Sequence, residues 1–433
     1  MIFILEQKDF LIHNCPLCDS ERIEYKFVAH GRVITECLEC GHLFSNPQRE
    51  NLDANNLIKP LYSQDDFKKF IKFYTNSDNP FCVDNLDIVK SPADLLKDTR
   101  EKMKDGDSLF LFVPTLDSRN AKRQRQKWTA FEQERLHFFS FKTLNNILCK
   151  IGFGEIEFVN AGENGLFVRA VKMPKNNTVS FIIPVYNEKS TVLELLNTVY
   201  KKDISHLGLN KEIIIIESNS TDGTKEIVQK FVNDHQEIKL ILEDKPQGKG
   251  HAVRNGFKVA TGDFIAIQDG DLEYDINDYD KLLPPLVKYQ EAFILGSRHS
   301  GNWQMRKFGD GEKFLAAFLN LGQIIFTSLI NFGCGVRLKD PFTMFKLFRR
   351  ECLYGLEFDG NRFEIDWEIL IKLIRKGYIP FEIPVNFLSR GFSQGKKVKI
   401  FKDPILWIIN FIRYRYFYKI HTTGGKNIQH DSK

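Results

Sequence analysis

The most constraining feature of this sequence is a series of short apolar segments between residues 179 and 275, each followed by polar side chains. The segments are Val179–Pro184, Glu212–Glu217, Ile238–Leu242 and Phe264–Ile267. Each is short enough for a buried parallel strand, and the stretches between them have the length of helices. The alternation predicts a parallel α/β sheet that binds its ligand at the carboxyl ends of the strands.

Acidic side chains follow three of these predicted strands. Glu188 comes after the first, Glu217 ends the second, and Asp269 and Asp271 follow the fourth. Mg²⁺ and Mn²⁺ take one or two protein carboxylates and complete their shell with water and phosphate oxygens. We therefore predict a Mg²⁺ or Mn²⁺ site at Asp269 and Asp271. A solvated acidic loop is the competing interpretation, and the crowding of acids in this segment disfavours it.

Further elements are expected around this core. Thr221 or Asp222 is expected to cap the helix that follows the second strand. We also expect a helix over residues 278–289, a strand over 340–348, and a helix over 363–376 that ends at Gly377.

Residues 178–418 resemble glycosyltransferase family 2, and within it the dolichyl- and polyprenyl-phosphate sugar synthases. The matching segments are Pro184–Glu188, Ser218–Thr224, Gly248–Gly250, Gln268–Asp275, Gly296–Arg298, Asp340–Lys346 and Phe363–Glu368. They cover over half of the chain in the expected order. The resemblance implies a GT-A (Rossmann-like) fold, a mostly parallel sheet flanked by helices. It also implies that a sugar is transferred from a nucleotide-diphosphate donor with inversion at its anomeric carbon.

The resemblance also assigns roles to individual residues. It implies donor binding by Pro184, Tyr186, Glu188, Glu217, Asp222, Lys249 and Asp269. It implies catalytic roles for Asp269, Asp271, Glu364, Asp366 and Arg298. It also implies that Glu273 is a candidate third ligand of the ion on Asp269 and Asp271. Most relatives have Asp-Asp-Gly-Ser where this chain has residues 217–220, so the base of the donor stays open. The acceptor is polyprenyl phosphate, which needs no general base, or a surface-glycan hydroxyl, which needs a carboxylate such as Glu364, Asp366 or Glu368.

Four cysteines near the N-terminus have the spacing Cys-x2-Cys-x18-Cys-x2-Cys. This spacing is typical of a closed tetrahedral Zn²⁺ site, and its ligands are Cys15, Cys18, Cys37 and Cys40. The residues between the two pairs alternate as in a hairpin, with strands over 23–28 and 31–35. We therefore predict a structural zinc module over residues 10–50, in which metal supplies much of the folding energy.

The region from 55 to 173 combines a predicted strand over 108–113 with a predicted helix over 141–151. Residues 105–114, a turn followed by a strand and a proline, and the run Phe131–Ser140 match a known pattern. Together with the four-cysteine module, the region resembles the second half of a class I S-adenosylmethionine methyltransferase that modifies sugars. Such enzymes bind their cofactor on a glycine-rich turn, and no glycine lies between Tyr62 and Leu86. We interpret the region as truncated and inactive, expect no S-adenosylmethionine binding, and predict a structural role for His137.

Charge is concentrated at the C-terminus, where residues 390–433 hold ten Lys or Arg against two Asp in a chain of net charge +5. A polar break at 174–178 separates the preceding region from a transferase domain over 178–395, and a basic aromatic helix and tail follow over 396–433. That helix could lie in a membrane surface or pack on the catalytic domain, and residues 313–331 could form core or a lipid-facing helix. Residues 303–310 are expected to form a basic aromatic loop.

The start of the chain has no signal-peptide pattern, and no apolar run is long enough to span a membrane. We expect a cytoplasmic protein, either free or peripherally associated with the inner leaflet, that acts in polysaccharide or glycan biosynthesis. Two other classes compete: a non-catalytic scaffold with a degenerate transferase domain, and a nucleic-acid-binding protein. The acidic pair disfavours the first, and the second would require a salt-dependent shift of DNA.

Overall fold

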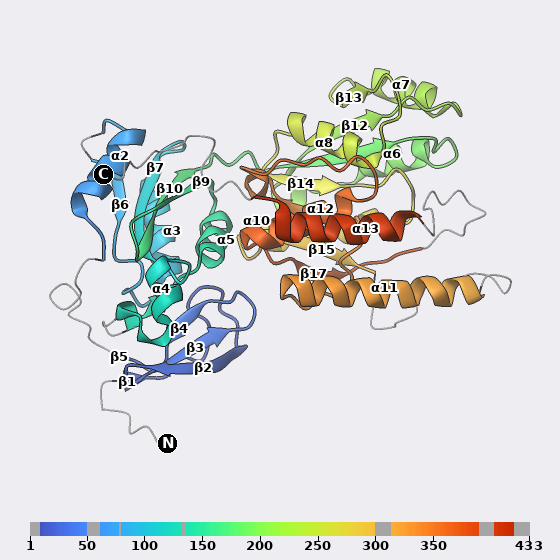
Figure 1. Cartoon of the computed structure of the whole chain (residues 1–433). Coiled ribbons are helices and arrows are strands. Elements are labelled where there is room, and N and C mark those ends of the chain that lie inside the picture. The colour runs from blue at the N-terminus through green and yellow to red at the C-terminus, as the bar shows by residue number, and fades with distance from the viewer. Residues whose placement is uncertain are drawn as a thin grey trace. The chain divides into compact units, whose positions relative to one another are not determined.

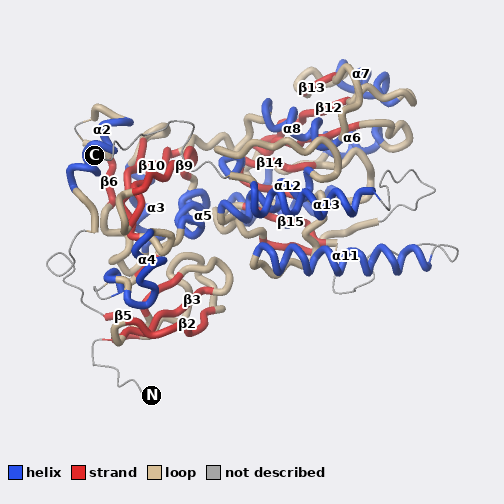
Figure 2. Tube along the Cα trace, viewed as in Figure 1, coloured by secondary structure: helices blue, strands red, loops and turns tan. Residues whose placement is uncertain are grey.

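The computed structural model describes residues 9–49, 61–77, 79–131, 135–298, 313–388 and 402–419. The chain divides into two compact units, an N-terminal unit of residues 1–174 with 421–433 and a C-terminal unit of residues 175–420. Figures 1 and 2 show the helices and strands of each. The boundary between the units lies between Pro174 and Lys175.

The N-terminal unit contains two four-stranded sheets and a short ribbon. The first sheet is antiparallel, in the order β2 (Ile23–Ala29), β3 (Arg32–Cys37), β4 (Leu43–Ser45) and β8 (His137–Phe138). The second has the order β6 (Phe81–Val83), β7 (Ser108–Pro114), β10 (Gly165–Lys172) and β9 (Phe153–Asn160), with only β6 and β7 parallel. The ribbon pairs β1 (Asp9–Phe10) with β5 (Gln48–Arg49). The longer helices are α2 (Gln64–Tyr74), α3 (Pro92–Lys102), α4 (Arg119–Gln124) and α5 (Phe141–Ile151).

Strand β8 joins the cysteine module to the region that follows it. Its residues pair with β4, and Ser45 donates its backbone N–H to the Leu136 carbonyl at 2.9 Å. His137 is buried between the His42 ring, with Nδ1 3.1 Å from His42 Nε2, and the Val89 carbonyl, 2.8 Å from its Nε2. Burial lowers the pKa of His137 to about 4, so the ring is neutral at pH 7. These contacts suit the structural role predicted for it. The two segments predicted as separate domains form one unit.

The C-terminal unit is built on a seven-stranded mixed sheet (Figure 1). Its order is β13 (Lys239–Leu242), β12 (Asn210–Glu217), β11 (Thr178–Val185), β14 (Phe264–Ile267), β16 (Lys346–Arg349), β15 (Phe293–Ser297) and β17 (Phe381–Pro384). β16 runs antiparallel to both of its neighbours, and the other pairs are parallel. The predicted α/β sheet is therefore confirmed, and its four predicted strands correspond to β11, β12, β13 and β14.

Helices cover both faces of this sheet because side chains alternate along each strand. Phe181 of β11 faces one layer, where its ring meets Tyr279 at 4.9 Å between centroids. Its neighbour Ile182 faces the other, where it packs against Gly256 of α8. The helices are α6 (Val192–Lys201), α7 (Thr224–Asn233), α8 (Lys249–Val259), α9 (Tyr279–Leu282), α10 (Pro284–Val287), α11 (Lys313–Cys334), α12 (Ile365–Lys376) and α13 (Lys402–Ile412).

Three local predictions need correction. The helix expected over 278–289 is broken into α9 and α10, because Pro284 and Pro285 cannot donate a backbone N–H to a continuing helix. The strand expected over 340–348 is limited to β16. Neither Thr221 nor Asp222 caps α7; the N-cap is Gly223, with φ of +98°.

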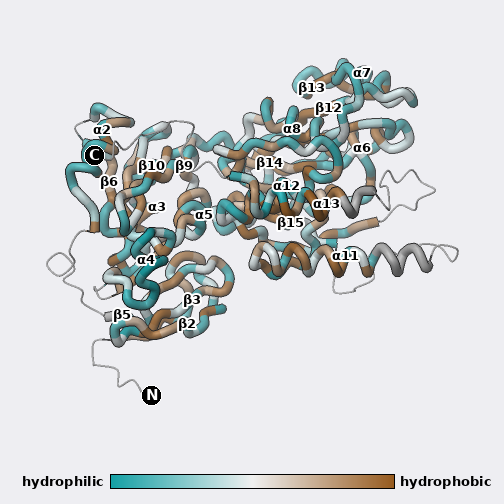
Figure 3. Tube along the Cα trace, in the orientation of Figure 1, coloured by the Kyte–Doolittle hydropathy of each residue, from teal (hydrophilic) through white to brown (hydrophobic). Residues whose placement is uncertain are grey.

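The apolar helix α13 packs by one face on α11 and α12 of the C-terminal unit. Trp407 of α13 stacks near Trp367 of α12 and meets Phe326 of α11 edge to face. A π-helical turn (Arg413–Phe417) follows, and Arg375 donates to the Tyr414 and Tyr418 carbonyls beside it. Figure 3 shows apolar residues along α13 and the neighbouring part of α11.

No helix among the described residues is both long and apolar enough to cross a membrane. The loop predicted over 303–310 and the end of the basic tail, from residue 420 onward, lie outside the described residues.

Candidate functional site

Parallel register brings the predicted site segments to one edge of the C-terminal sheet. Val185 pairs with Glu217 on the neighbouring strand, and Ile182 pairs with Ile267 on the other side. Gln268 continues this pairing by donating its backbone N–H to the Ile182 carbonyl at 2.9 Å. The residues after β11, β12 and β14 therefore meet at the carboxyl edge, where ligands bind in sheets of this type.

The loops after β11 and β12 are joined by side-chain hydrogen bonds. Asn187 has a φ of +52°, and its backbone N–H donates to Ser220 Oγ at 2.9 Å. Its side-chain Oδ1 accepts from the backbone N–H of Thr221, also at 2.9 Å. Glu188 donates its backbone N–H to Thr224 Oγ1 at 2.9 Å. This bracing holds residues 186–188 in a fixed conformation.

Two carboxylates assigned to donor binding are used to shape these loops. Glu217 is fully buried and accepts from the backbone N–H groups of Ser220 at 2.7 Å and Asn219 at 3.0 Å. Asp222 accepts from the backbone N–H groups of Thr224 at 3.0 Å and Lys189 at 3.1 Å. Their geometry favours loop-positioning roles over direct contact with a nucleoside.

The acidic pair follows β14 and is packed closely against β11. A Cβ on Gly270 would lie 3.1 Å from the Pro184 carbonyl oxygen, so the loop that carries Asp269 and Asp271 has little space for a side chain at Gly270. Gln268 is anchored by Tyr279, which donates its hydroxyl to Gln268 Oε1 at 3.0 Å. Asp271 Oδ1 accepts from the backbone N–H of Glu273 at 3.3 Å.

The surroundings of Asp269 are suited to a cation. The Lys249 ammonium forms an ion pair with Asp269, and both side chains are about 18% exposed. Asp269 thus already has a positively charged partner. Its carboxylate oxygens are the kind of hard ligand that Mg²⁺ and Mn²⁺ require. Among the described residues, the only set of three or more metal-binding side chains within 4.8 Å is the four cysteines, so Glu273 does not gather with the pair.

Arg298 has a partner other than a phosphate. Its Nε lies 2.8 Å from Asp340 Oδ2 and its Nη2 lies 2.7 Å from Asp340 Oδ1, a two-point ion pair with a fully buried carboxylate. Burial opposes the charge of Arg298, but Asp340, Tyr274 and Glu273 outweigh it and keep its pKa above the usual value. The guanidinium is therefore fixed in place by this pair.

Of the three candidate carboxylates near the start of α12, only Asp366 has a buried oxygen without a hydrogen-bond partner. Glu364 Oε1 accepts from the backbone N–H groups of Asn361 and Arg362. Glu368 accepts from the backbone N–H of Gly360 at 2.8 Å and pairs with buried Lys372. Asp366 Oδ1, by contrast, is out of contact with solvent and has no hydrogen-bond partner.

Asp366 faces the cationic side of the site. Burial raises its pKa to about 6, although Lys249 and Lys346 act in the opposite direction and Asp269 adds to the rise. Of the three acids that the sequence left open, Asp366 is thus the one placed to take or share a proton near neutral pH.

Lys346 was missed by the sequence analysis. It lies fully buried on β16 and donates to the Thr343 carbonyl. Burial lowers its pKa to about 8, while Asp366 and Asp340 raise it and Lys249 and Arg298 lower it. A lone lysine in the apolar run Met344–Phe348 was the available signal, because buried lysines need a partner or a function.

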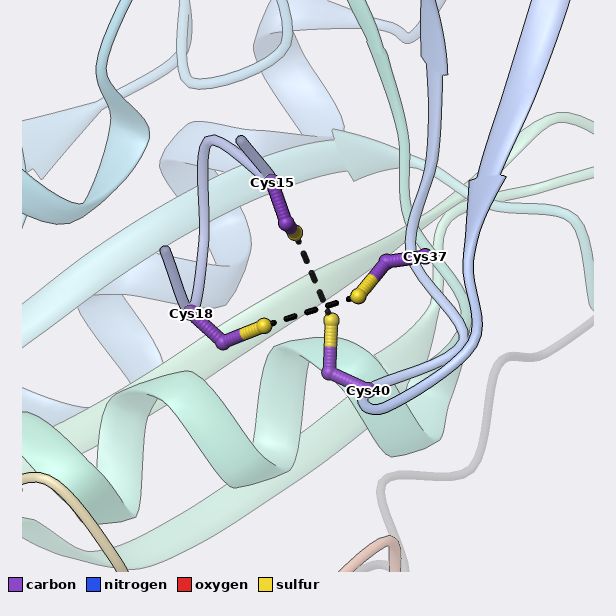
Figure 4. A group of neighbouring side chains, drawn as sticks. All are labelled: Cys15, Cys18, Cys37 and Cys40. Carbon is purple, nitrogen blue, oxygen red and sulfur yellow. Dashed lines mark hydrogen bonds between the residues drawn. The ribbon is translucent and has the colours of Figure 1, made fainter. Parts of the chain in front are cut away.

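The four cysteines of the N-terminal unit converge as predicted (Figure 4). Cys15 and Cys40 place their sulfurs 3.6 Å apart, and Cys18 and Cys37 place theirs 3.5 Å apart. All four sulfurs lie within 4.8 Å of one another. A tetrahedral Zn²⁺ with Zn–S bonds of ~2.3 Å separates its sulfurs by about 3.8 Å. The residues present therefore fit a closed zinc site.

Comparison with known proteins agrees with the geometry of the C-terminal unit. Residues 180–356 match the model of glycosyl transferase family 2. The matched residues all lie within the C-terminal unit. It has the α/β architecture and the sequence segments that the resemblance implied.

Individual relatives are similar over the same part of the chain. A dolichol-phosphate mannosyltransferase of Pyrococcus furiosus is 31% identical over 227 residues, which are 52% of this chain and 61% of that enzyme. A dolichyl-phosphate beta-glucosyltransferase of Dictyostelium discoideum is 28% identical over 60% of this chain and 81% of that enzyme. The chain thus spans about three fifths of the Pyrococcus enzyme.

Among solved structures, the chain is similar to glucosyl-3-phosphoglycerate synthase from Mycobacterium tuberculosis in complex with Mg²⁺ and uridine diphosphate. The identity is 16% over 56% of this chain and 81% of that one, with a TM-score of 0.40.

We predict one Zn²⁺ per chain at the cysteine site, measured by elemental analysis of purified protein. Cys37→Ser should abolish the metal and lower the unfolding midpoint, because the module between β2 and β4 depends on the cross-link. Cys82→Ser, at an exposed thiol outside the cluster, should retain both. Metal-free protein that unfolds at the wild-type midpoint would contradict the prediction.

Asp366→Asn should stabilise the protein at pH 7.5 and leave it close to wild type at pH 4. The folded-state pKa of about 6 lies above the ordinary value of 3.8. The charged carboxylate therefore costs stability, increasingly as pH rises from about 4 to 6, and in full above that. Removing the charge should recover on the order of 1–3 kcal/mol. Urea unfolding at both pH values measures this, and an equal effect at pH 4 would count against it.

Proposed function

We propose that this protein transfers a sugar from a nucleotide-diphosphate donor to polyprenyl phosphate. The observation that carries this proposal is the pair Asp269 and Asp271 at the carboxyl end of β14, beside Lys249, inside a family 2 glycosyltransferase domain. The relatives named above are enzymes of dolichyl phosphate, and they support this class of acceptor.

The donor diphosphate would bind at the acidic pair. A Mg²⁺ or Mn²⁺ held by Asp269 and Asp271 would neutralise charge on the departing diphosphate. Lys249 lies at the same place and would add positive charge from the protein itself. The segment of residues 186–188, braced by Asn187, would form the wall of the nucleoside pocket, and the identity of the base stays open because Glu217 is used on its own loop.

The acceptor oxygen would attack the anomeric carbon from the side opposite the diphosphate, which inverts that centre. A phosphate oxygen is already an anion and needs no base. Lys346 and Lys249 would attract it, and Asp366 would balance these charges. A sugar hydroxyl would instead need a proton acceptor, and Asp366 is the carboxylate placed for it.

A lipid acceptor also gives a role to an exposed apolar face on α11 and α13. Its side chains are Leu321, Ile324, Ile325, Phe332, Ile408, Ile409 and Ile412, followed by Phe417 in the π-helical turn. Phe332 is 93% exposed and Phe417 is 75% exposed. We propose that this face lies on a membrane surface, because apolar side chains beside basic ones suit the headgroup boundary.

The N-terminal unit would serve as a scaffold. S-adenosylmethionine binding is not expected there, and this stays a prediction. The zinc site would stabilise the unit and take no part in transfer, because four cysteine ligands leave no open coordination position.

Asp271→Asn should reduce sugar transfer by roughly 10²–10³ while the fold is retained, since it weakens one electrostatic contact to the leaving group. The assay measures nucleotide release from a panel of UDP- and GDP-sugars with polyprenyl phosphate present. Chelation of divalent ions should reproduce the loss, and Mg²⁺ or Mn²⁺ should restore activity. Wild-type rates for the variant in chelator would exclude the metal-assisted mechanism, whereas no transfer by the wild-type protein with any donor of the panel would exclude this function and favour a scaffold.

Membrane association is tested by flotation with vesicles that contain anionic lipid. Wild type should float, and Ile409→Glu combined with Phe417→Glu should remain at the bottom of the gradient. Leu193→Glu changes an equally exposed apolar residue on α6 and should behave as wild type. Equal flotation of the double variant would rule out the face on α11 and α13.

A further inference from the structure

The side chain of Lys249 contacts the carboxylate of Asp269, which the proposed function assigns as a ligand of a divalent ion. Its ammonium forms an ion pair with Asp269, and its surroundings leave both side chains only 18% exposed. The ammonium is therefore held at Asp269.

The backbone of Lys249 cannot move away from this position. The residue opens α8, and a glycine lies on each side of it. A Cβ on Gly248, whose φ is +101°, would lie 2.4 Å from the Asn361 carbonyl oxygen, and one on Gly250 would lie 2.4 Å from that of Gly360. His251 also donates its backbone N–H to the Asn361 carbonyl at 3.2 Å. The start of α8 is thus fixed against the loop before α12, and only the lysine side chain is able to move.

Two cations cannot share Asp269 at low cost. A divalent ion on this carboxylate would lie beside the ammonium in a partly dehydrated site, where like charges repel more strongly than in water. A lysine has a flexible four-carbon stem, so its ammonium can swing to another anion nearby. The donor diphosphate would be such an anion, since it binds at the same edge of the sheet.

We propose that Lys249 is an internal counter-ion for Asp269 that leaves this carboxylate when the donor diphosphate arrives, so that nucleoside diphosphate and divalent ion bind cooperatively. The proposal rests on the proposed function and adds an order to it: the metal alone binds weakly, and the metal with nucleotide binds tightly. By linkage, the ion must strengthen nucleotide binding by the same factor.

The test is a calorimetric titration of the full chain with Mn²⁺, alone and in the presence of UDP or GDP. Wild type should bind Mn²⁺ weakly alone and at least about tenfold more tightly with the nucleotide it recognises. Lys249→Met removes the ammonium and nearly keeps its length, so it should bind Mn²⁺ alone about tenfold more tightly than wild type. The factor by which nucleotide tightens Mn²⁺ binding should be smaller in this variant than in the wild-type protein.

Three further variants complete the experiment. Lys249→Arg keeps the cation and should behave as wild type, which guards against a general packing effect. Lys258→Met, at an exposed lysine near the end of the same helix, should not change either affinity. Asp269→Asn gives the baseline without the metal ligand, and circular dichroism confirms that each variant is folded.

The outcomes separate the two proposals. If wild type bound Mn²⁺ equally with and without either nucleotide, or if Lys249→Met bound it no more tightly than wild type, the counter-ion would be excluded while the transferase function stood. If wild type bound Mn²⁺ under none of these conditions, Asp269 would not be a metal ligand. Both proposals would then be overturned.

Discussion

Charge buried at the carboxyl edge of the central sheet is the constraint on which the C-terminal unit depends. Three cations are withdrawn from water there, Lys249, Lys346 and Arg298. Lys249 pairs with Asp269 and Arg298 pairs with Asp340, and removing either of these aspartates would leave an uncompensated charge in a poorly solvated place. The result is a site that is electrostatically assembled before any ligand arrives, with a positive side toward α8 and β16 and an acidic side at the end of β14.

This balance explains why some acids are available for chemistry and others are not. Glu217, Asp222 and Glu364 all lie near the site, yet each accepts backbone N–H groups from its own or an adjoining loop. Such bonds satisfy donors that would otherwise be buried without a partner. Asp366 sits among the cations instead, and its buried oxygen has no such bond. Proximity to the sheet edge is therefore a weaker guide to function than the partners that each oxygen already has.

Much of the fold could be predicted from the sequence because its signals are local. Apolar runs of strand length predicted β11, β12, β13 and β14, and the cysteine spacing indicated the cluster that the structure brings together.

The partners of single side chains could not be predicted, since they depend on segments far apart in the chain. Asp340 binding Arg298, 42 residues away, is an example. It also explains the short β16, because Asp340 lies in a loop shaped around that guanidinium. Lys346 on β16 was missed because the apolar pattern around it predicts a strand but does not indicate which side chains face the lysine.

Strand β8 has a consequence for how the N-terminal unit can be divided. Residues 137–138 complete the sheet in which β3 ends at Cys37, and they are contributed from almost a hundred residues downstream of it. During synthesis, the outer edge of β4 therefore stays unpaired until the ribosome has passed residue 138. A fragment cut near residue 55 would keep all four thiols but would present that open edge to other chains, which is a route to aggregation.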